Sequence, residues 1–335
     1  MKPVAITVGD VSGIGPEIVV RTLADAKTMQ ELPAFVIGPA NALVHAAIAW
    51  APTARVRRIT GVADHHPAPG VLDVLDVGVV GDDFAHGQVS AATGRAAFEA
   101  ISKAIDLAKS GQIDAICTAP IHKEALAAAG VPYPGHTEML AELSSSVDTA
   151  MMLVNPQLRT MLVTVHCSLL QAVAQLSVAR ELRIIRLAHR TLLDMGIARP
   201  RIAIAGLNPH AGEGGLFGRE DIDLIAPAVT AARAEGIDAT GPLPGDTVFM
   251  QARRGRYDLV VAQYHDQGLI PIKLLGVEDG VNVTAGLPFV RTSPDHGTAF
   301  DIAGRGVADI SSLRVALRTA HELAAARTMR QPPRS

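Results

Sequence analysis

The sequence predicts an α/β fold of about two domains, each with a largely parallel sheet covered by helices. Short β-rich runs alternate with longer helical patterns, which is typical of βαβ units. Apolar residues make up 48% of the chain and aromatic residues only 3%, so the core is built from Ala, Val, Leu and Ile, as in α/β enzymes with buried strands. The length of 335 residues suggests two domains at roughly 150 residues each.

The elements follow from the local hydrophobic pattern. The expected strands are Val4–Val8, Ala34–Ile37, Val71–Leu75, Ile113–Cys117, Ala150–Val154, Thr160–Val165, Arg201–Ala205, Leu259–Ala262 and Val281–Thr284. The expected helices are Pro16–Leu23, Ala91–Lys109, Lys123–Ala128, Glu138–Leu143, Ala179–Met195, Glu220–Glu235 and Ser311–Ala325.

Gly and Pro residues mark two expected passages between domains, near Gly130–Gly135 and near Gly286–Thr292. The first domain is therefore expected to be discontinuous, with residues 1–134 and about 290–330. The second domain is expected to span residues 135–289. Within the polar end of the chain, Met329–Ser335, residues 331–335 are expected to form a loose tail.

Charge and cysteine content exclude several classes of protein. The net charge is −3, and no basic stretch with interleaved aromatic residues suits nucleic-acid binding. Two cysteines cannot form a disulfide framework, which fits a reducing cytoplasm. The apolar run Val4–Val8 is too short for a signal peptide, and the run Ala42–Trp50 is too short for a membrane span. We therefore expect a soluble, cytoplasmic protein that binds neither nucleic acid nor membrane.

Three histidines follow expected strands, and ligands of open α/β sheets bind beyond the carboxyl ends of the strands. His166 follows Thr160–Val165, His210 lies shortly after Arg201–Ala205, and His265 lies shortly after Leu259–Ala262. Converging neutral imidazoles can hold a divalent metal and leave positions open for substrate. The alternative is that each histidine is a hydrogen-bonded loop residue, because no short-range metal motif is present.

Two further groups suit an anion. The segment around His136 and Thr137 opens a helix, where free backbone N–H groups attract negative charge, although Thr137 as a simple N-cap is the plainer interpretation. Lys273, Asn282 and Arg291 lie in or near a Gly-rich, strand-like stretch and could clamp a phosphate or carboxylate. Ordinary surface charge is the alternative for this second group.

The turn Gly9–Glu17 is glycine-rich, but it matches neither the dinucleotide fingerprint nor a P-loop. Its third glycine position holds Ile18, so a tight strand-to-helix turn is the better interpretation. Any dinucleotide must then bind elsewhere. Cys117 and Cys167 have no evident base beside them, which favours small core residues over nucleophiles.

Longer motifs, in one order along nearly the whole chain, resemble the 4-hydroxythreonine-4-phosphate dehydrogenase family of vitamin B6 synthesis. They are Gly13-Ile-Gly-Pro-Glu17, Tyr133-Pro-Gly-His-Thr-Glu138, Gly206-Leu-Asn-Pro-His-Ala-Gly-Glu213, Tyr264-His-Asp-Gln-Gly268, Gly280-Val-Asn-Val-Thr284 and Gly286-Leu-Pro-Phe-Val-Arg-Thr-Ser-Pro-Asp-His-Gly-Thr-Ala299. The resemblance implies two α/β/α domains, as in isocitrate and isopropylmalate dehydrogenases. It also implies a homodimer whose active site lies in the interdomain cleft at the subunit interface.

The resemblance assigns roles residue by residue. It implies metal ligands at His166, His210 and His265, for one divalent ion such as Zn, Mg, Mn or Co. It implies substrate-binding residues at His136, Thr137, Lys273, Asn282 and Arg291, with Asp246 and Lys273 as candidate catalytic residues. The segment His296–Gly304 is similar to an adenosine-binding loop, which makes His296, Gly297 and Asp301 the candidate contacts of NAD or NADP.

The implied reaction is metal-dependent oxidation and decarboxylation of a 4-phosphorylated 3-hydroxy acid, as in the conversion of 4-hydroxythreonine 4-phosphate to 3-amino-2-oxopropyl phosphate and CO2. The segments Ile270–Leu275 and Thr298–Ala303 are more similar to D-threonate or D-erythronate 4-phosphate dehydrogenases, whose product would be dihydroxyacetone phosphate. More distant relatives oxidise dihydrodiol carboxylates. Two alternatives outside this chemistry remain open, a metallohydrolase and a two-domain binding protein without catalysis.

Overall fold

The computed structural model describes residues 2–146, 148–276 and 279–330. The chain divides into two compact units: residues 1–147 with 287–325 form unit 1, and residues 148–286 with 326–335 form unit 2. The first crossing comes after residue 147, later than the expected Gly130–Gly135, because Met139 and Leu140 belong to the core of unit 1. The return at residue 287 falls within the expected segment Gly286–Thr292. The expected tail at 331–335 lies outside the described residues.

Unit 1 contains a sheet whose neighbouring strands are all parallel, in the order β3-β4-β2-β1-β5-β12. Its strands are β1 (Val4–Thr7), β2 (Ala34–Gly38), β3 (Arg55–Ile59), β4 (Val71–Asp76), β5 (Ala115–Thr118) and β12 (Val290–Pro294). Because parallel strands share one direction, the loops after β1, β4, β5 and β12 open at the same edge of the sheet.

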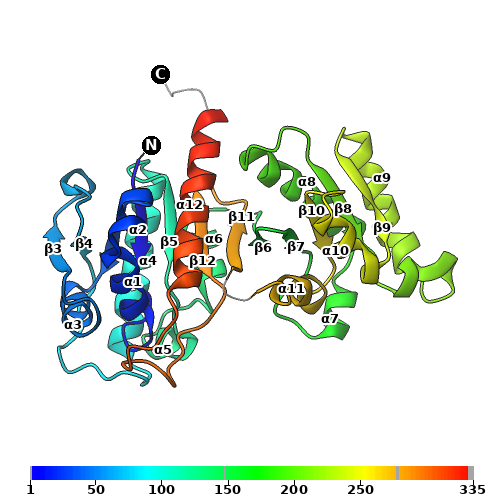
Figure 1. Cartoon of the computed structure of the whole chain (residues 1–335). Helices are drawn as coiled ribbons and strands as arrows, with labels where there is room; N and C mark the ends of the chain where they lie inside the picture. Colours follow the sequence, from blue (N-terminus) through cyan, green and yellow to red (C-terminus); the bar gives the residue numbers. More distant parts are fainter. Residues whose placement is uncertain (1, 147, 277–278, 331–335) are drawn as a thin grey trace. The chain divides into compact units, whose positions relative to one another are not determined.

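Helices cover this sheet (Figure 1). They are α1 (Gly15–Ala24), α2 (Ala26–Glu31), α3 (Ala40–Trp50), α4 (Ala91–Lys109), α5 (Lys123–Ala128), α6 (His136–Leu143) and α12 (Ser311–Arg330), with a short 3-10 turn at Val62–Asp64. One face of the sheet packs on α4, α5 and α6 through a core that includes Phe35, Ile101 and Leu126. The Thr292 hydroxyl donates to the Ala316 carbonyl at 2.9 Å, which fixes α12 beside β12.

Unit 2 contains a mixed sheet in the order β11-β6-β7-β10-β8-β9. Its strands are β6 (Ala150–Asn155), β7 (Leu158–Leu162), β8 (Arg201–Ala205), β9 (Asp238–Leu243), β10 (Leu259–Ala262) and β11 (Val281–Ala285). β6 is antiparallel to both of its neighbours, whereas β7, β10, β8 and β9 are parallel. These four strands therefore present four consecutive carboxyl ends at one edge of the sheet.

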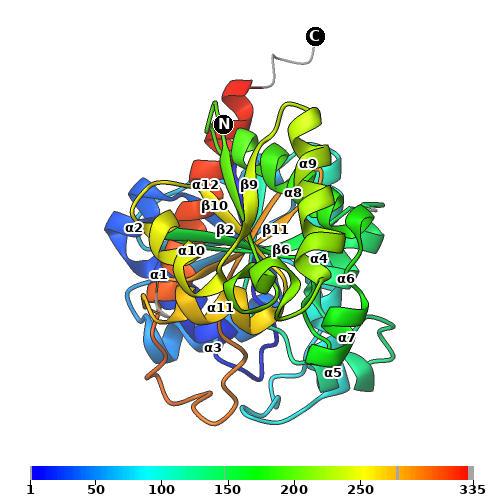
Figure 2. The same cartoon turned by 90° about the vertical axis from the view of Figure 1, so that its right-hand side faces the viewer.

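The helices of unit 2 pack on the two faces of its sheet (Figure 2). They are α7 (Leu169–Ala174), α8 (Val178–Asp194), α9 (Ala226–Ala234), α10 (Gly245–Arg253) and α11 (His265–Lys273), with a 3-10 segment at Pro209–Gly215 (η2) and a short π-helix at Asp221–Ile225 (η3). Val248 of α10, together with Leu269 and Ile272 of α11, shares a core with residues of β7, β8 and β10.

The predicted α/β class with a largely parallel sheet is confirmed, and most elements differ from expectation only at their ends. The prediction missed β3, β9, β12, α2, α3, α7, α10 and α11. β3 has arginine at Arg55, Arg57 and Arg58, because an edge strand can leave these side chains partly exposed. α11 contains Gly268 and Pro271, which obscure a helical pattern. The last helix continues to Arg330, beyond its expected end at Ala325.

The described helices include none that is both long and apolar enough to cross a membrane. Both cysteines are free, as expected. Burial raises the pKa of the Cys117 thiol to about 12, which fits its expected place in the core and not a nucleophilic role.

Candidate active site

The four parallel strands of unit 2 each lead into a candidate residue. His166 follows β7, His265 follows β10, His210 follows β8, and Asp246 follows β9 at the start of α10. The order of the strands makes these ends immediate neighbours. The position of Asp246 among them could not be predicted from the sequence, because β9 was not predicted. Topology thus gathers the predicted metal ligands and the predicted catalytic carboxylate at one edge.

His166 and His265 lie side by side. Their ring centroids are 5.9 Å apart, with the ring planes at 45°. Both rings line a cavity of about 580 Å³, together with residues of α7 and the start of α11: Val165, Cys167, Ser168, Leu169, Gln171, Ala172, Tyr264 and Asp266. Two imidazole rings that face one open cavity fit a pair of nitrogen donors to a metal.

Asp266 is a neighbour of this pair that the prediction did not assign to the site. Its Oδ1 lies 2.7 Å from the Nδ1 of His265. If Nδ1 carries the proton and donates to this carboxylate, Nε2 is left with a free lone pair, as a metal ligand requires. The signal in the sequence was its position directly after His265.

His210 lies in a loop with unusual backbone geometry. The φ angles of His210, Ala211 and Glu213 are 53°, 52° and 43°, in the left-handed region that ordinary residues avoid. Asp221 holds the start of this loop, because its carboxylate accepts hydrogen bonds from the backbone N–H of Leu207 at 2.8 Å and of Asn208 at 3.1 Å. The strained loop is therefore anchored on a carboxylate that is itself fully buried.

The structure does not bring His210 into a group with the other two histidines. Its side chain is 62% exposed, and its Nδ1 lies 3.9 Å from the Oε2 of Glu213. Within residues 2–146, 148–276 and 279–330, no three His, Cys, Asp or Glu side chains are arranged to hold a metal ion. The set of three ligands therefore stays a prediction, with two of its members adjacent and the third at the next strand end.

Side-chain amides tie these strand ends together. The Thr164 hydroxyl donates to the Gln263 carbonyl at 2.8 Å, and the Gln263 Nε2 donates to the Ala205 carbonyl at 2.8 Å. The Gln267 Nε2 donates to the Gly206 carbonyl at 2.7 Å. The ends of β7, β10 and β8 are thus cross-linked directly beneath the three histidines.

The other candidates of unit 2 lie farther along the chain. Lys273 is the last residue of α11 and is exposed, so it lies on a helix and not in the strand-like stretch that was expected. Asn282 lies in β11, paired in register with Leu153 of β6, and is half-buried.

Unit 1 places Arg291 and His136 together. Arg291 of β12 is only 2% exposed, and its Nη2 donates to the Thr118 Oγ1 at 2.7 Å. Burial, and then the positive charge of Arg291, hold the pKa of His136 well below its ordinary value. Burial also lowers the pKa of Arg291, to about 10. The pair therefore combines a buried cation with a neutral imidazole.

Helix α6 starts two residues earlier than the cap prediction required. Its N-cap is Gly135, and His136 and Thr137 are its first two residues, so the prediction of Thr137 as the N-cap was wrong. Gly135 takes an extended backbone and leaves the first N–H groups of the helix uncapped by any side chain. The free N–H groups at this helix start can still bind an anion.

The loop after β12 contains the candidate cofactor contacts. His296 is half-buried, Gly297 is exposed with open space around its Cα, and Asp301 is exposed. The loop lies on the turn after β1, because the Ile14 N–H donates to the Thr298 carbonyl at 3.0 Å. The glycine-rich turn after β1 therefore supports this loop and forms no phosphate loop of its own.

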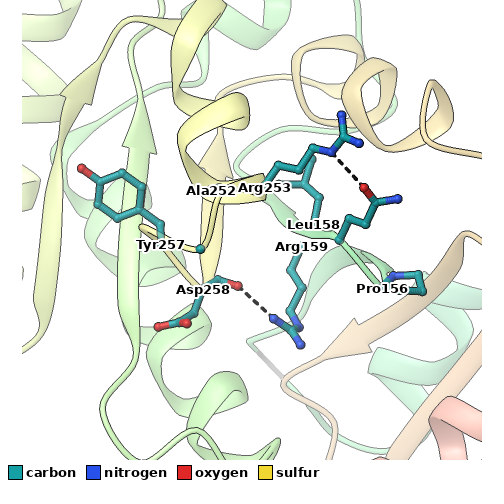
Figure 3. A pocket seen from close by; sticks show the side chains of 9 residues that line it. Pro156, Leu158, Arg159, Ala252, Arg253, Tyr257 and Asp258 are labelled. Atoms are coloured by element: carbon teal, nitrogen blue, oxygen red, sulfur yellow. Dashed lines mark hydrogen bonds between the residues drawn. The ribbon is translucent and has the colours of Figure 1, made fainter.

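A second pocket of unit 2 lies at the opposite end of the strands. It has a volume of about 340 Å³ and is lined by Pro156, Gln157, Leu158, Arg159, Ala252, Arg253, Gly255, Tyr257 and Asp258. Arg253 donates to the Gln157 side chain at 2.8 Å, and Arg159 donates to the Asp258 carbonyl at 3.3 Å. The two guanidinium groups point in opposite directions (Figure 3), so they do not converge on one anion.

Comparison with known proteins gives consistent matches. The family model of the pyridoxal phosphate biosynthetic protein PdxA matches residues 30–320. A 4-hydroxythreonine-4-phosphate dehydrogenase of Beijerinckia indica is 56% identical, over 96% of this chain and 95% of the relative. A D-threonate 4-phosphate dehydrogenase of Cupriavidus necator is 49% identical, over 97% of this chain and 98% of the relative.

Solved structures agree with these matches. The crystal structure of a 4-hydroxythreonine-4-phosphate dehydrogenase from Klebsiella pneumoniae superimposes with a TM-score of 0.90. It shares 48% sequence identity and covers 96% of this chain and 98% of the solved chain. The fold described above is therefore that of experimentally determined relatives.

Proposed function

The chain belongs to the PdxA family of pyridoxal phosphate biosynthetic proteins, and we propose that this dehydrogenase oxidises and decarboxylates a 4-phosphorylated 3-hydroxy acid. The observation that carries the proposal is the pairing of buried Arg291 with neutral His136 in unit 1. A buried guanidinium suits a permanently anionic group such as a phosphate, and a neutral imidazole can donate a hydrogen bond without adding charge.

We assign substrate binding to residues that can bind the oxygen atoms at both charged ends of the substrate. Arg291, His136 and the N–H groups at the start of α6, including that of Thr137, bind one anionic end. Lys273 and Asn282 complete the set, with Lys273 as a point charge and Asn282 as a hydrogen-bond donor. Charge-assisted contacts of this kind orient the 3-hydroxyl for reaction.

His166, His210 and His265 are proposed to hold one divalent metal, with Zn, Mg, Mn and Co as candidates. When bound, such an ion polarises the reacting oxygen and stabilises negative charge during loss of CO2. The fit rests on the adjacent rings of His166 and His265 and on Asp266, whose Oδ1 lies 2.7 Å from the Nδ1 of His265 and leaves Nε2 for the metal when Nδ1 carries the proton. We also assign catalytic roles to Asp246, which follows the neighbouring strand end and would orient a bound group, and to Lys273, the last residue of α11.

NAD or NADP is proposed to bind along the loop after β12. His296 presents a buried Nε2 that has no hydrogen-bond partner among the described residues, and Gly297 leaves room for close approach. We assign Asp301, which is exposed in the same loop, to the ribose hydroxyls of the cofactor; a carboxylate there favours NAD, since it repels a 2′-phosphate. When bound, the nicotinamide accepts the hydride from the substrate carbon.

The group on carbon 2 of the substrate distinguishes two candidates. An amine corresponds to 4-hydroxythreonine 4-phosphate, and a hydroxyl corresponds to D-threonate or D-erythronate 4-phosphate; relatives of both names match this chain. Comparing kcat/KM for the three compounds, with absorbance of the reduced nicotinamide as the signal, tests the proposal. Turnover of at least one of them is expected.

Two results would assign a different function. Activity only on a non-phosphorylated cyclic diol carboxylate would make the chain a dihydrodiol carboxylate dehydrogenase. Hydrolysis of a phosphate ester without any change in nicotinamide absorbance would favour the metallohydrolase alternative, because histidines and a carboxylate can also activate water.

A homodimer is the proposed assembly, in the cytoplasm. Large apolar side chains are exposed on α7 and α11, the two helices that begin at the histidine cavity, and at the residue that follows α11: Leu169 at 60%, Leu170 at 82%, Ile270 at 55% and Leu274 at 81%. Exposed apolar residues gathered near a site are typical of a protein interface. A second copy that covers them would enclose the cavity.

A further inference from the structure

Glu181 is a buried acid that the proposed function does not use. It lies in the first turns of α8, and its residue exposure is 0%. Neither carboxyl oxygen has a hydrogen-bond donor among the residues that the structure describes. A buried carboxylate without donors is costly, whereas the protonated acid carries no charge and can itself donate.

The polar neighbour of this carboxyl is the side chain of Gln263. Gln263 is 1% exposed and uses its Nε2 to donate to the Ala205 carbonyl. Its Oε1 is buried and has no donor anywhere in the described part of the chain. Because the Gln263 Nε2 already donates to the Ala205 carbonyl, a full hydrogen bond between the two side chains has to use the unpartnered Oε1, and its proton has to come from Glu181.

The electrostatic surroundings also favour the protonated form. Burial is the main cause that raises the pKa of Glu181 to about 8, and the nearby Asp221 raises it further. The nearby Gln263 amide and the charge of Arg180 lower the pKa but are outweighed. At neutral pH the acid is therefore mostly neutral.

We propose that Glu181 is a protonated positioning residue that donates to the Gln263 Oε1 and so orients the amide that joins β10 to β8. This inference deepens the proposed function, because the joined strand ends lead to His265 and His210. The Gln263 N–H also donates to the Gln267 Oε1 at 2.7 Å, and Gln267 in turn holds the Gly206 carbonyl. Loss of the Glu181 proton donor would free the Gln263 amide to rotate and loosen both connections.

Three variants separate a positioning role from simple filling of space. Glu181→Leu keeps the volume but removes the donor, Glu181→Gln keeps a donor of similar shape, and Glu322→Leu makes the same change at an exposed position of α12. Replacing an unsatisfied polar group with an apolar one can leave stability nearly unchanged, so the leucine variant is expected to fold. Thermal unfolding checks that Glu181→Leu folds. If that variant does not fold, the comparison of Glu181→Gln with the parent provides the test.

Two readouts do not depend on turnover. In infrared difference spectra between about pH 5 and 7, the parent is expected to show the carbonyl band of a protonated acid that Glu181→Gln lacks. Hydrogen exchange at residues 205–208 and 263–267 is expected to accelerate at least about tenfold in Glu181→Leu and to stay near the parent rate in Glu181→Gln. Absence of the band, or unchanged exchange in Glu181→Leu, would overturn the proposal.

Kinetics provide the third readout. In Glu181→Leu, kcat is expected to fall by about 10- to 100-fold with little change in KM, while Glu181→Gln restores most of it and Glu322→Leu matches the parent. Adding Gln263→Met to Glu181→Leu is expected to cost no more than Gln263→Met alone, because both act through one contact. If the kcat of Glu181→Leu equals that of the parent, the positioning role is refuted. An inactive parent would refute the proposed function, and the infrared and exchange results would still decide this inference.

Discussion

Arg291 carries its positive charge in the interior of unit 1, where its guanidinium holds the Thr118 hydroxyl and lowers the pKa of His136. We predict that Arg291→Met lowers kcat/KM for the phosphorylated substrate by about 100-fold or more, because a buried charge-assisted contact contributes several kcal/mol to binding. Steady-state kinetics measure this effect.

Arg291→Lys is the matched variant, since it keeps the charge but loses the planar fork of donors. It should be intermediate, with a raised KM. Unfolding midpoints should not fall in Arg291→Met, because an apolar side chain no longer buries a charge. Parent-like kcat/KM in Arg291→Met would remove Arg291 from the substrate site.

Asp73 shows how a buried acid can instead be held ionised. Burial alone would raise its pKa, but hydrogen bonds from Arg57 at 2.6 Å, from His65 and from the His66 N–H outweigh burial and lower it. A depressed folded-state pKa contributes stability that is present above the unfolded pKa and is lost as the pH falls through the folded value.

Asp73→Asn is therefore predicted to cost about 1–3 kcal/mol of unfolding free energy at pH 7. The difference from the parent should begin to shrink below about pH 4, where the unfolded-state carboxyl takes up a proton, and should be lost as the pH falls through the lower folded-state pKa. Urea unfolding at several pH values measures both, with the exposed Asp106→Asn as control. A difference that does not change with pH would contradict the assigned charge.

The loop after β8 is the element on which the site depends most, because it carries His210 through left-handed backbone angles. A Cβ at Gly206 would lie 2.8 Å from the Asp221 Oδ1 and 2.9 Å from the Ala211 Cα. We predict that Gly206→Ala displaces this loop, lowers kcat by about tenfold or more and costs about 1–3 kcal/mol of stability.

Gly61→Ala is the control for the loop, since nothing lies within 4 Å of a Cβ there and the backbone is extended. Kinetics and thermal unfolding on both variants test the prediction. Equal behaviour of Gly206→Ala and Gly61→Ala would show that the loop tolerates the added methyl group, and that its exact position does not matter for turnover.

The whole molecule is expected to work as a dimer. We predict that Leu170→Glu with Leu274→Glu gives a monomer with little activity, because two charges replace side chains that are 82% and 81% exposed in one chain. Sedimentation velocity of the parent and the double variant measures the masses. An active, strictly monomeric parent would exclude the dimer.

Complementation between dimers tests whether the active site is shared. His166 and His265 are adjacent within one chain, so mixing their alanine variants should restore no activity. His265→Ala and Arg291→Met should instead be mixed under conditions of subunit exchange. Some activity should return if His265 and Arg291 of one active site come from different chains. Activity assays on the exchanged mixtures distinguish the two arrangements.

Features that depend on short stretches of chain could be predicted from the sequence. Strand–helix alternation, the helix at Ala91–Lys109 and the strands at Arg201–Ala205 and Leu259–Ala262 are visible because hydrophobic period is a local property. The placement of His166, His210 and His265 after strands is equally local. The motifs around Gly286–Ala299 identified the family before any geometry was known.

Tertiary structure alone decided which of these residues meet. The order β7-β10-β8-β9 arises from pairing between distant segments, and it makes neighbours of His166 and His265 while Asp246 joins the same edge. β9 and β12 escaped prediction because their sheet neighbours, and not their own pattern, stabilise them as strands. The role of Glu181 could not be predicted from the sequence either, because distant segments create its surroundings. Its pKa is raised mainly by burial and further by Asp221, and both come from long-range packing around a helix that, in sequence, shows only one acid in its first turn.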